Sequence, residues 1–383
     1  MEVVTEKPTT KAVPEGYKRT EVDVIPEDWG VRKIGEVSEV KIGRDLKKDH
    51  YADYSDSTYK YPVYSNTVAD RGLYGYYDFS EYKGNSVTVI GRGVGLGTAF
   101  AREKSFGAIG RLIVIAPKPD IYFKYLAHYI NEGLNLHQES SGIPQLTGVQ
   151  IRKYYVIIPT LKEQRAIAEA LSDVDALIAE LDALIEKKQQ IKKSAMQQLL
   201  TGKKRLPGFS GEWEEKKLWE LLTVMHGKSQ KSVASESGEY PILGTSGQIG
   251  KATTYLYDKP SVLIGRKGTI DRPQYMEEPF WTIDTLFYTQ VNENAIAKFL
   301  YYKFLLIDWT SYNEASGVPS LNSTTIENIE VFFPDSIEEQ KAIVVIINDM
   351  DAEIKALQAK RNKYDKIKQG MMQELLTGKT RLV

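Results

Sequence analysis

The sequence predicts an α+β protein made of two similar units, each of which ends in a long helix. The phrase MQQLLTGKKRL at 196–206 returns as MQELLTGKTRL at 372–382, and the copies differ at only two positions. Short β-branched runs lie upstream of each copy, and a coiled-coil pattern of apolar residues leads directly into it. A long internal repeat of this kind indicates two tandem copies of one structural unit.

The repeat reaches far upstream of this phrase. LKEQRAIAEALSDVDALIAEL at 161–181 aligns with IEEQKAIVVIINDMDAEIKAL at 337–357, and SGIPQL at 141–146 aligns with SGVPSL at 316–321. The tripeptide Ile-Gly-Arg also occurs in both halves, in VTVIGRG and in SVLIGRK. Because the offset between the copies drifts from 174 to 184 residues, we expect loops of different length in the two units.

The segment before each long helix is predicted to be an α+β domain. Short runs of β-branched residues bounded by glycine, proline or charge predict strands, namely VTVIG, RLIVIAP, KYYVIIP, SVLIG and IEVFFP. Residues 121–134 and 294–309 have helical periodicity and occupy matching places in the two copies. Since strands and helices follow in the same order, the two domains are expected to share a fold.

The two long helices are marked at both ends. Each begins after a proline, with Thr160 or Ser336 as the candidate N-cap and a glutamate three residues later, and each ends near Gly202 or Gly378. Apolar residues of the first helix alternate at spacings of four and three, which is typical of a coiled coil: Ile167, Leu171, Val174, Ile178, Leu181 and Ile185. The second helix repeats the pattern, so we expect the two helices to pack on each other.

Composition narrows the class of protein. The chain has 383 residues, too many for one ordinary core, and its formal net charge of −1 gives no strong overall attraction to nucleic acid. The absence of cysteine excludes disulfides, thiolate zinc sites, iron–sulfur clusters and cysteine nucleophiles. The polar N-terminus lacks a signal-peptide core, and no run of about 18 apolar residues occurs, so the expected location is cytoplasmic.

No pattern in the sequence predicts catalysis, a metal or a cofactor. GRGVGLG at 91–97 follows a predicted strand but does not fit the G-x-G-x-x-G phosphate loop, and its counterpart GRKGTID has lost most of the glycines. A tight turn that presents Arg92 and Arg266 is the better interpretation. The four histidines have no ligand spacing, and no Walker lysine loop or nucleophile elbow is present. We therefore expect a protein that catalyses nothing.

Local basic turns are the strongest chemical signal. KIGRDLKK at 41–48 carries four basic residues and one acid, and HGKSQK at 226–231 lies at a comparable place in the second unit. Residues 51–82 contain nine tyrosines. Basic residues among tyrosines and glycines suit a surface that contacts phosphates and base edges. A solvated face and ordinary sheet packing are the alternative, since tyrosine is also a good strand residue.

Several motifs together resemble the DNA-specificity subunits of type I restriction–modification systems. They are PEDW at 26–29 and GEW at 211–213 opening the units, the EQ-x-AI helix starts within 159–167 and 334–343, and the LLTG-K-x-RL helix ends at 199–206 and 375–382. The resemblance covers nearly the whole chain. It implies target-recognition domains at 1–158 and 203–333, and spacer helices at 159–202 and 334–383. The two spacer helices would pack antiparallel as a coiled coil, which gives the chain an internal pseudo-two-fold repeat.

The resemblance also implies a function and partners. Each recognition domain would read one half of a bipartite, asymmetric site in double-stranded DNA, while the helices set the distance between half-sites. Two methyltransferase (modification) subunits that carry S-adenosylmethionine would dock on the helices and methylate adenine. Restriction subunits with nuclease and motor activity would join them, with ATP and Mg on these partners and no cofactor on this chain.

Twelve residues are candidates for DNA contact on this interpretation. Arginine would be bidentate to guanine, glutamine or asparagine to adenine, and lysine would hold phosphates. The candidates are Arg44, Lys47, Lys48, Arg92, Arg102 and Gln145 in the first unit, and Lys228, Lys231, Arg266, Lys267, Arg272 and Asn322 in the second. The alternatives are a helical interaction scaffold that does not read DNA, and a specificity chain whose partner fuses methylation with cleavage. An enzyme is the least favoured.

Overall fold

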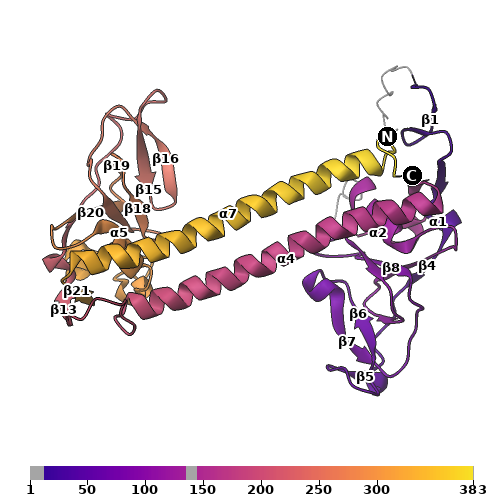
Figure 1. Ribbon diagram of the computed structural model, residues 1–383, viewed down its shortest axis with the longest axis horizontal. Helices are drawn as coiled ribbons and strands as arrows, with labels where there is room; N and C mark the ends of the chain where they lie inside the picture. The colour runs from indigo at the N-terminus through magenta and orange to yellow at the C-terminus, as the bar shows by residue number, and fades with distance from the viewer. Residues whose placement is uncertain (1–12, 135–144, 383) are drawn as a thin grey trace. The chain divides into compact units, whose positions relative to one another are not determined.

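The computed structural model describes residues 13–134 and 145–382. The chain forms two compact units, and the first is assembled from both ends of the chain: it comprises Met1–Glu180 with Lys360–Val383, and the second comprises Leu181–Ala359. Two helices, α4 (Leu161–Leu199) and α7 (Ile337–Leu375), each continue from one unit into the other (Figure 1). Each helix has 39 residues.

The first unit contains two four-stranded sheets and two strand pairs. The main sheet has the order β4-β11-β8-β9 and is antiparallel throughout, and the second sheet has the order β10-β6-β7-β5. β12 pairs with β3 and β1 with β2. The strands are β1 Tyr17–Arg19, β2 Val24–Pro26, β3 Gly30–Lys33, β4 Ser38–Ile42, β5 Tyr51–Ala52, β6 Tyr61–Tyr64, β7 Leu73–Tyr77, β8 Ser86–Val89, β9 Ala99–Arg102, β10 Gly107–Ala108, β11 Ile113–Pro117 and β12 Tyr155–Ile158. The shorter helices are α1 Ile34–Val37, α2 Phe123–Gly133 and α3 Gly148–Ile151, with 3-10 turns η1 Lys48–His50 and η2 Ala69–Gly72.

The second unit repeats this topology with fewer strands. Its main sheet has the order β14-β20-β17-β18, its second sheet the order β16-β15-β19, and β13 pairs with β21. The strands are β13 Trp213–Lys217, β14 Leu222–Met225, β15 Tyr240–Gly244, β16 Gly247–Ala252, β17 Ser261–Gly265, β18 Gln274–Met276, β19 Trp281–Thr282, β20 Leu286–Val291 and β21 Glu330–Pro334. The shorter helices are α5 Ala297–Phe304 and α6 Ser323–Glu327, with 3-10 turns η3 Leu218–Glu220 and η4 Trp309–Tyr312. In both units the pairing is antiparallel except for one short parallel pair, β6 with β10 and β15 with β19.

The predicted α+β repeat with two long antiparallel helices is confirmed. The five β-branched runs all form strands, and the two periodic segments form α2 and α5. One boundary differs, because α5 ends at Phe304 where the sequence predicts helix to 309. The chain there turns into η4, whose N-cap Asp308 accepts a hydrogen bond from the amide of Thr310.

Each core takes the start of one long helix and the end of the other. In the first unit, Ile167 and Leu171 of α4 pack in the same buried cluster as Met372 and Leu375 of α7. In the second, the contributions are exchanged: the start of α7 and the end of α4 supply Ile343, Ile347, Met196, Leu199 and Leu200. Each of these buried side chains contributes roughly 1.5–3 kcal/mol to the stability of its unit. The amphipathic helix ends are therefore part of the domain cores.

Ion pairs connect the two long helices and show that they are antiparallel. In the first unit, Lys368 Nζ of α7 lies 2.8 Å from an Asp175 carboxylate oxygen of α4. In the second, Lys188 lies 2.6 Å from Glu353, and Lys192 pairs with Asp351. Higher numbers on α4 thus meet lower numbers on α7. Val174 and Ile185, two positions of the predicted coiled-coil pattern, are only half-buried in this stretch.

The repeated phrase closes each unit through a buried glutamate. In the first unit, Glu163 accepts hydrogen bonds from Trp29 Nε1 (3.0 Å) and from the Arg381 guanidinium (2.6 and 2.9 Å). In the second, Glu339 accepts equivalent bonds from Trp213 (3.1 Å) and Arg205 (2.6 and 2.8 Å). We call each trio an end clamp. The tryptophan opens the unit, the glutamate begins one long helix, and the arginine follows the end of the other.

The end clamp corrects one detail of the predicted helix starts. The Thr160 hydroxyl accepts from the amide of Glu163 (3.3 Å) and Ser336 from that of Glu339 (3.2 Å), as an N-cap should. The glutamate carboxylates bond to tryptophan and arginine, however, so the reciprocal half of the predicted capping box is replaced by a tertiary contact. The neighbouring Gln164 fixes the beginning of α2, because its Oε1 accepts from the amide of Tyr122 (2.7 Å).

Candidate nucleic-acid interface

The Ile-Gly-Arg tripeptides lie at the ends of equivalent strands: the first follows β8, and the second begins with the last two residues of β17. In the first unit, Arg92 pairs with Gln145 as an antiparallel bridge, and its guanidinium donates to Gln145 Oε1 at 3.1 Å. Both side chains are exposed. Gly91 is required here because a Cβ would lie 2.8 Å from the carbonyl oxygen of Leu146. The tight turn predicted from the sequence is thus observed, and it presents an arginine and a glutamine side by side.

The second unit builds the corresponding turn with other side chains. Lys267 forms the antiparallel bridge with Ser320, and the amide of Leu321 donates to the carbonyl of Arg266 (3.0 Å). Arg266 itself is half-buried and donates to the carbonyl of Asp284 (3.2 Å), so Lys267 is the more exposed cation. The pairing thus lies one residue later than in the first unit, because Leu146 bonds to Gly91 there. Both units hold an antiparallel bridge at this place and offer different hydrogen-bonding groups. Residues 141–144 of SGIPQL lie outside the described residues.

The predicted basic turns also prove to be structurally equivalent. The amide of Arg44 donates to the carbonyl of Ala108 in β10 (3.0 Å), and the amide of Lys228 donates to that of Thr282 in β19 (2.9 Å). A glycine precedes each cation and packs so closely that a Cβ would meet backbone at 2.8 Å and 2.0 Å respectively. Both Arg44 and Lys228 are exposed, so each unit holds one cation at this edge.

The remaining lysines and Arg272 are exposed, and contacts with neighbouring residues fix some of these side chains more than others. Lys47 lies 3.3 Å from Glu81 and 4.5 Å from the Phe79 ring centre, which fixes its position and partly neutralises its charge. Lys48 begins η1, Lys231 follows the second basic turn, and Arg272 precedes β18. Since their side chains face solvent, all four remain candidates for phosphate contact.

Two candidates have structural roles instead. Arg102 is only 5% exposed, and its guanidinium bonds to the Thr88 hydroxyl (2.9 Å) and stacks 3.5 Å from the Tyr64 ring centre. Burial lowers the pKa of Arg102 to about 10. Asn322 is the N-cap of α6, where its side chain accepts from the amide of Thr325 (2.7 Å). Burial removes Arg102 from the candidate surface. Asn322 is engaged at both ends of its side-chain amide, because the carbonyl serves the cap and the amino group donates to Glu314.

The structure adds one residue that sequence reasoning missed. Asp70 and Arg71 both have positive φ, 44° and 50°, although neither is glycine. Arg102 holds this turn by donating to the carbonyl of Arg71 at 2.6 Å. Strained backbone of this kind persists where surrounding structure enforces it and often presents a functional side chain. No sequence signal identified the turn, because aspartate and arginine give no warning of a left-handed conformation.

The described residues offer neither a metal site nor a membrane-spanning helix. Among the described residues, no cluster of three or more histidine, aspartate or glutamate side chains could hold a metal ion. No helix within residues 13–134 and 145–382 is long and apolar enough to cross a membrane. The architecture is that of a binding protein with two related heads, each offering exposed cations on glycine-supported turns.

Sequence comparison identifies the family. The chain belongs to the type I restriction modification DNA specificity domain family, whose model matches residues 26–193 and 210–368. It is 25% identical over 423 aligned positions to the type I restriction enzyme MjaVIII specificity subunit of Methanocaldococcus jannaschii, an alignment that covers 96% of each chain. It is 30% identical over 171 residues to the putative type I specificity subunit S.MpnORF507P of Mycoplasma pneumoniae, covering 45% of this chain and 47% of that one.

Solved structures have the same fold. The crystal structure of a type I restriction–modification S subunit from M. genitalium aligns with a TM-score of 0.66 at 19% identity, covering 91% of this chain and 96% of that one. A chain from a structure describing complex assembly and conformational transition of the type I system aligns with a TM-score of 0.55 at 15% identity, covering 93% and 99%. The expected resemblance is therefore confirmed. The chain is a DNA specificity subunit with two target-recognition domains, and such subunits are non-catalytic and carry no cofactor of their own.

Proposed function

We propose that this chain directs a type I restriction–modification complex to a bipartite, asymmetric DNA site, with each recognition domain reading one half. The observation that carries the proposal is the pair of equivalent turns with different side chains. Arg92 and Gln145 stand in the first unit where Lys267 and Ser320 stand in the second. Because direct readout depends on donor and acceptor patterns, two such turns would select different bases.

The proposed contact surface excludes the two residues with structural roles. It comprises Arg44, Lys47, Lys48, Arg92 and Gln145 in the first unit, and Lys228, Lys231, Arg266, Lys267 and Arg272 in the second. Arg92 and Gln145 are the proposed base readers, since their side chains are exposed and aligned by a mutual hydrogen bond. The lysines would contact phosphates, which position the protein without reading sequence.

The long helices would set the half-site spacing and dock two modification subunits. The modification subunits would bind S-adenosylmethionine, and restriction subunits with ATP and Mg would complete the assembly. Ion pairs between α4 and α7 support the spacer role, because they join the helices at defined positions along their length. The near-zero net charge of −1 is compatible with partners that supply much of the phosphate contact.

A genome-wide map of adenine methylation tests the proposal. The host would express this chain with its modification subunit, and the control would omit this chain. We expect a split motif of two unlike halves that appears only when the chain is present. If both subunits are soluble and no new motif appears, or if the motif is a palindrome, the proposed two-reader function is incorrect.

A further inference from the structure

The two units fill one equivalent space with different side chains. This is the space between the edge strand of the main sheet, the helix that follows the sheet, and a long helix. Phe100 of β9 lies opposite Thr88, and Tyr275 of β18 lies opposite Val262, so Phe100 and Tyr275 hold the same register position. On the helices, Ala127 and His128 of α2 correspond to Tyr301 and Tyr302 of α5.

The second unit fills this space with its own aromatic side chains. The rings of Tyr275 and Tyr301 lie 5.7 Å apart between centres at a tilt of 38°, and Tyr301 contacts Tyr302 at 5.4 Å. Lys298 lies over the Tyr275 ring at 4.1 Å. Aromatic pairs in this geometry contribute about 0.5–1.5 kcal/mol beyond the area they bury. The strand and α5 are thus joined by packed rings.

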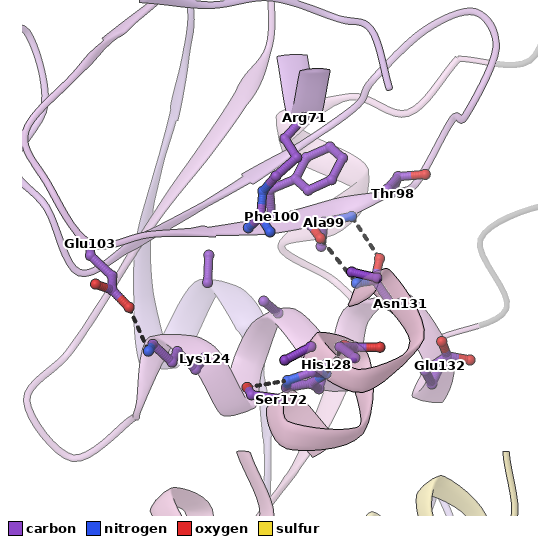
Figure 2. Close-up of a pocket in the computed structure, with 15 residues that line it drawn as sticks. Arg71, Thr98, Ala99, Phe100, Glu103, Lys124, His128, Asn131, Glu132 and Ser172 are labelled. Atoms are coloured by element: carbon purple, nitrogen blue, oxygen red, sulfur yellow. Dashed lines mark hydrogen bonds and ion pairs between the residues drawn. The ribbon is translucent and has the colours of Figure 1, made fainter. Parts of the chain in front are cut away.

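The first unit leaves the same space open. Ala127 replaces the tyrosine, and a cleft of about 710 Å³ lies between β9, α2 and α4 (Figure 2). Its walls are fixed by hydrogen bonds and ion pairs. Asn131 bonds to both the amide and the carbonyl of Ala99 (2.7 and 3.0 Å), His128 Nε2 lies 3.2 Å from the Ser172 hydroxyl, and Lys124 pairs with Glu103 at 2.5 Å. The cleft is therefore a formed site whose central ring is missing.

Arg71 is held at the edge of this cleft by the strained turn. Its guanidinium lies over the Phe100 ring, 5.5 Å from the ring centre, and Figure 2 shows the two side chains together above α2. Among the described residues, no salt bridge to Arg71 is present. The buried Arg102 holds this turn in place by donating a hydrogen bond to the Arg71 carbonyl. Arg71 could therefore bind an anionic group, while the open space beside Phe100 could hold an aromatic ring of the same ligand.

We propose that this cleft receives an aromatic side chain of the modification subunit, with a carboxylate of the same segment bound by Arg71. The inference rests on the proposed function, which supplies the partner. The ring would take the place that Tyr301 fills in the second unit. Arginine pairs with carboxylates through two parallel hydrogen bonds, and a buried aromatic anchor contributes strongly to protein interfaces.

The charges of the cleft favour a protein segment over DNA. Glu103, Glu132 and Asp175 line the same cleft as Arg71 and Lys124. Ion pairs with Lys124 and Lys368 offset these three carboxylates, so the cleft has no excess of positive charge to attract a polyanionic backbone. A peptide needs only one carboxylate, which Arg71 would bind. Because Tyr275 and Tyr301 fill the aromatic position in the second unit, two copies of one partner would meet two different surfaces. The cleft thus makes docking asymmetric.

Photo-crosslinking tests the occupant directly. A benzophenone amino acid replaces Ala176, an exposed cleft residue of α4, in the full chain, and the variant is irradiated with purified modification subunit. Ala352 of α7 holds the equivalent position in the second unit and serves as the matched control. We expect a crosslink from 176 to a segment of the modification subunit that contains a tyrosine or phenylalanine beside an acid. Equal crosslinking from 352, or a crosslinked segment without an aromatic residue, would overturn the proposal.

Filling the cleft from within gives a second measurement. Ala127→Tyr should supply the missing ring and lower affinity for one modification subunit on the order of tenfold. Arg71→Glu, a surface change that leaves the cleft open, should weaken the same step. Tyr301→Ala in the second unit should leave that step unchanged. Calorimetry gives the two affinities, and thermal unfolding checks that each variant is folded.

The outcomes separate this inference from the proposed function. Wild-type chain that fails to bind the modification subunit would overturn both. Wild-type binding of two subunits with affinities unaffected by Ala127→Tyr and Arg71→Glu would overturn the cleft alone. Loss of DNA binding by Arg71→Glu in the absence of partner would assign the cleft to DNA and also overturn the proposal.

Discussion

At the residue scale, the same chemical type serves different purposes according to burial. Arg92 and Arg102 lie only ten residues apart, and both looked like DNA contacts in the sequence. The structure exposes the first on a glycine-supported turn and buries the second against Thr88 and Tyr64. Burial was not readable from the sequence because Arg102 is a charged residue at the end of an otherwise apolar strand, β9. The aromatic partner and the strained turn that it stabilises come from elsewhere in the chain.

A substitution at Arg92 distinguishes these roles. Arg92→Ala should relax one base position in one half-site or weaken binding to it by about 1–3 kcal/mol, because the guanidinium is exposed and aligned with Gln145. Methylation mapping of the variant gives the base preference, and a DNA-binding assay of the assembled complex gives the affinity. Lys267→Ala is the matched change in the other half-site. An unchanged motif with unchanged affinity would remove Arg92 from the proposed surface.

At the element scale, the end clamps determine which helix end belongs to which domain. Glu163 is almost fully buried, and burial would raise its pKa, but hydrogen bonds from Arg381 and Trp29 outweigh burial and lower the pKa below its ordinary value of 4.5. The clamp therefore contributes stability at pH values above that ordinary value. This contribution is lost as the pH falls through the lower pKa of the folded state.

Removing the arginine tests the clamp. Arg381→Ala should destabilise the chain by about 3–5 kcal/mol at pH 7, because it leaves a buried carboxylate without its partner. The difference from wild type should shrink as the pH is lowered below 4.5 and the carboxylate becomes protonated. Denaturant unfolding at several pH values measures both effects. Lys379→Ala, an exposed change in the same segment, is the control and should have little effect. A loss for Arg381→Ala that is equal at all pH values would contradict the assigned ion pair.

At the whole-molecule scale, each unit contains segments from both repeats. Residues 360–383 belong to the first unit, and the first copy of the repeated phrase belongs to the second unit. Each phrase thus completes the domain of the other repeat. This explains why nearly identical sequences occur 176 residues apart, since each must fit an equivalent pair of tryptophan and glutamate side chains.

The spacer role leads to a prediction at this scale. Inserting four residues into both long helices, near 181 and 357, should lengthen each by about 6 Å. The gap between half-sites should then change while the bases within each half stay the same. Methylation mapping reads both quantities, and inserting four residues into the exposed loop near Gly208 is a control that leaves the helices alone. Altered bases with an unaltered gap would show that the helices do not set the spacing.

The sequence by itself determined the repeat, the α+β class, the long helices and the family. These follow from local patterns, because strand alternation, coiled-coil spacing and terminal glycines act over a few residues. The repeat then doubled each signal and showed that the two domains share a fold. The division of the chain into recognition domains and spacer helices at 158, 202 and 333 stays a prediction.

Only the tertiary structure decided which side chains are free and what the repeated phrases contact. The capping glutamates proved to bind arginines 218 and 134 residues away in sequence. The open cleft beside Ala127 likewise depends on a strand, two helices and a strained turn that meet in space. Burial, pairing and shape depend on contacts between distant segments, which no local pattern records.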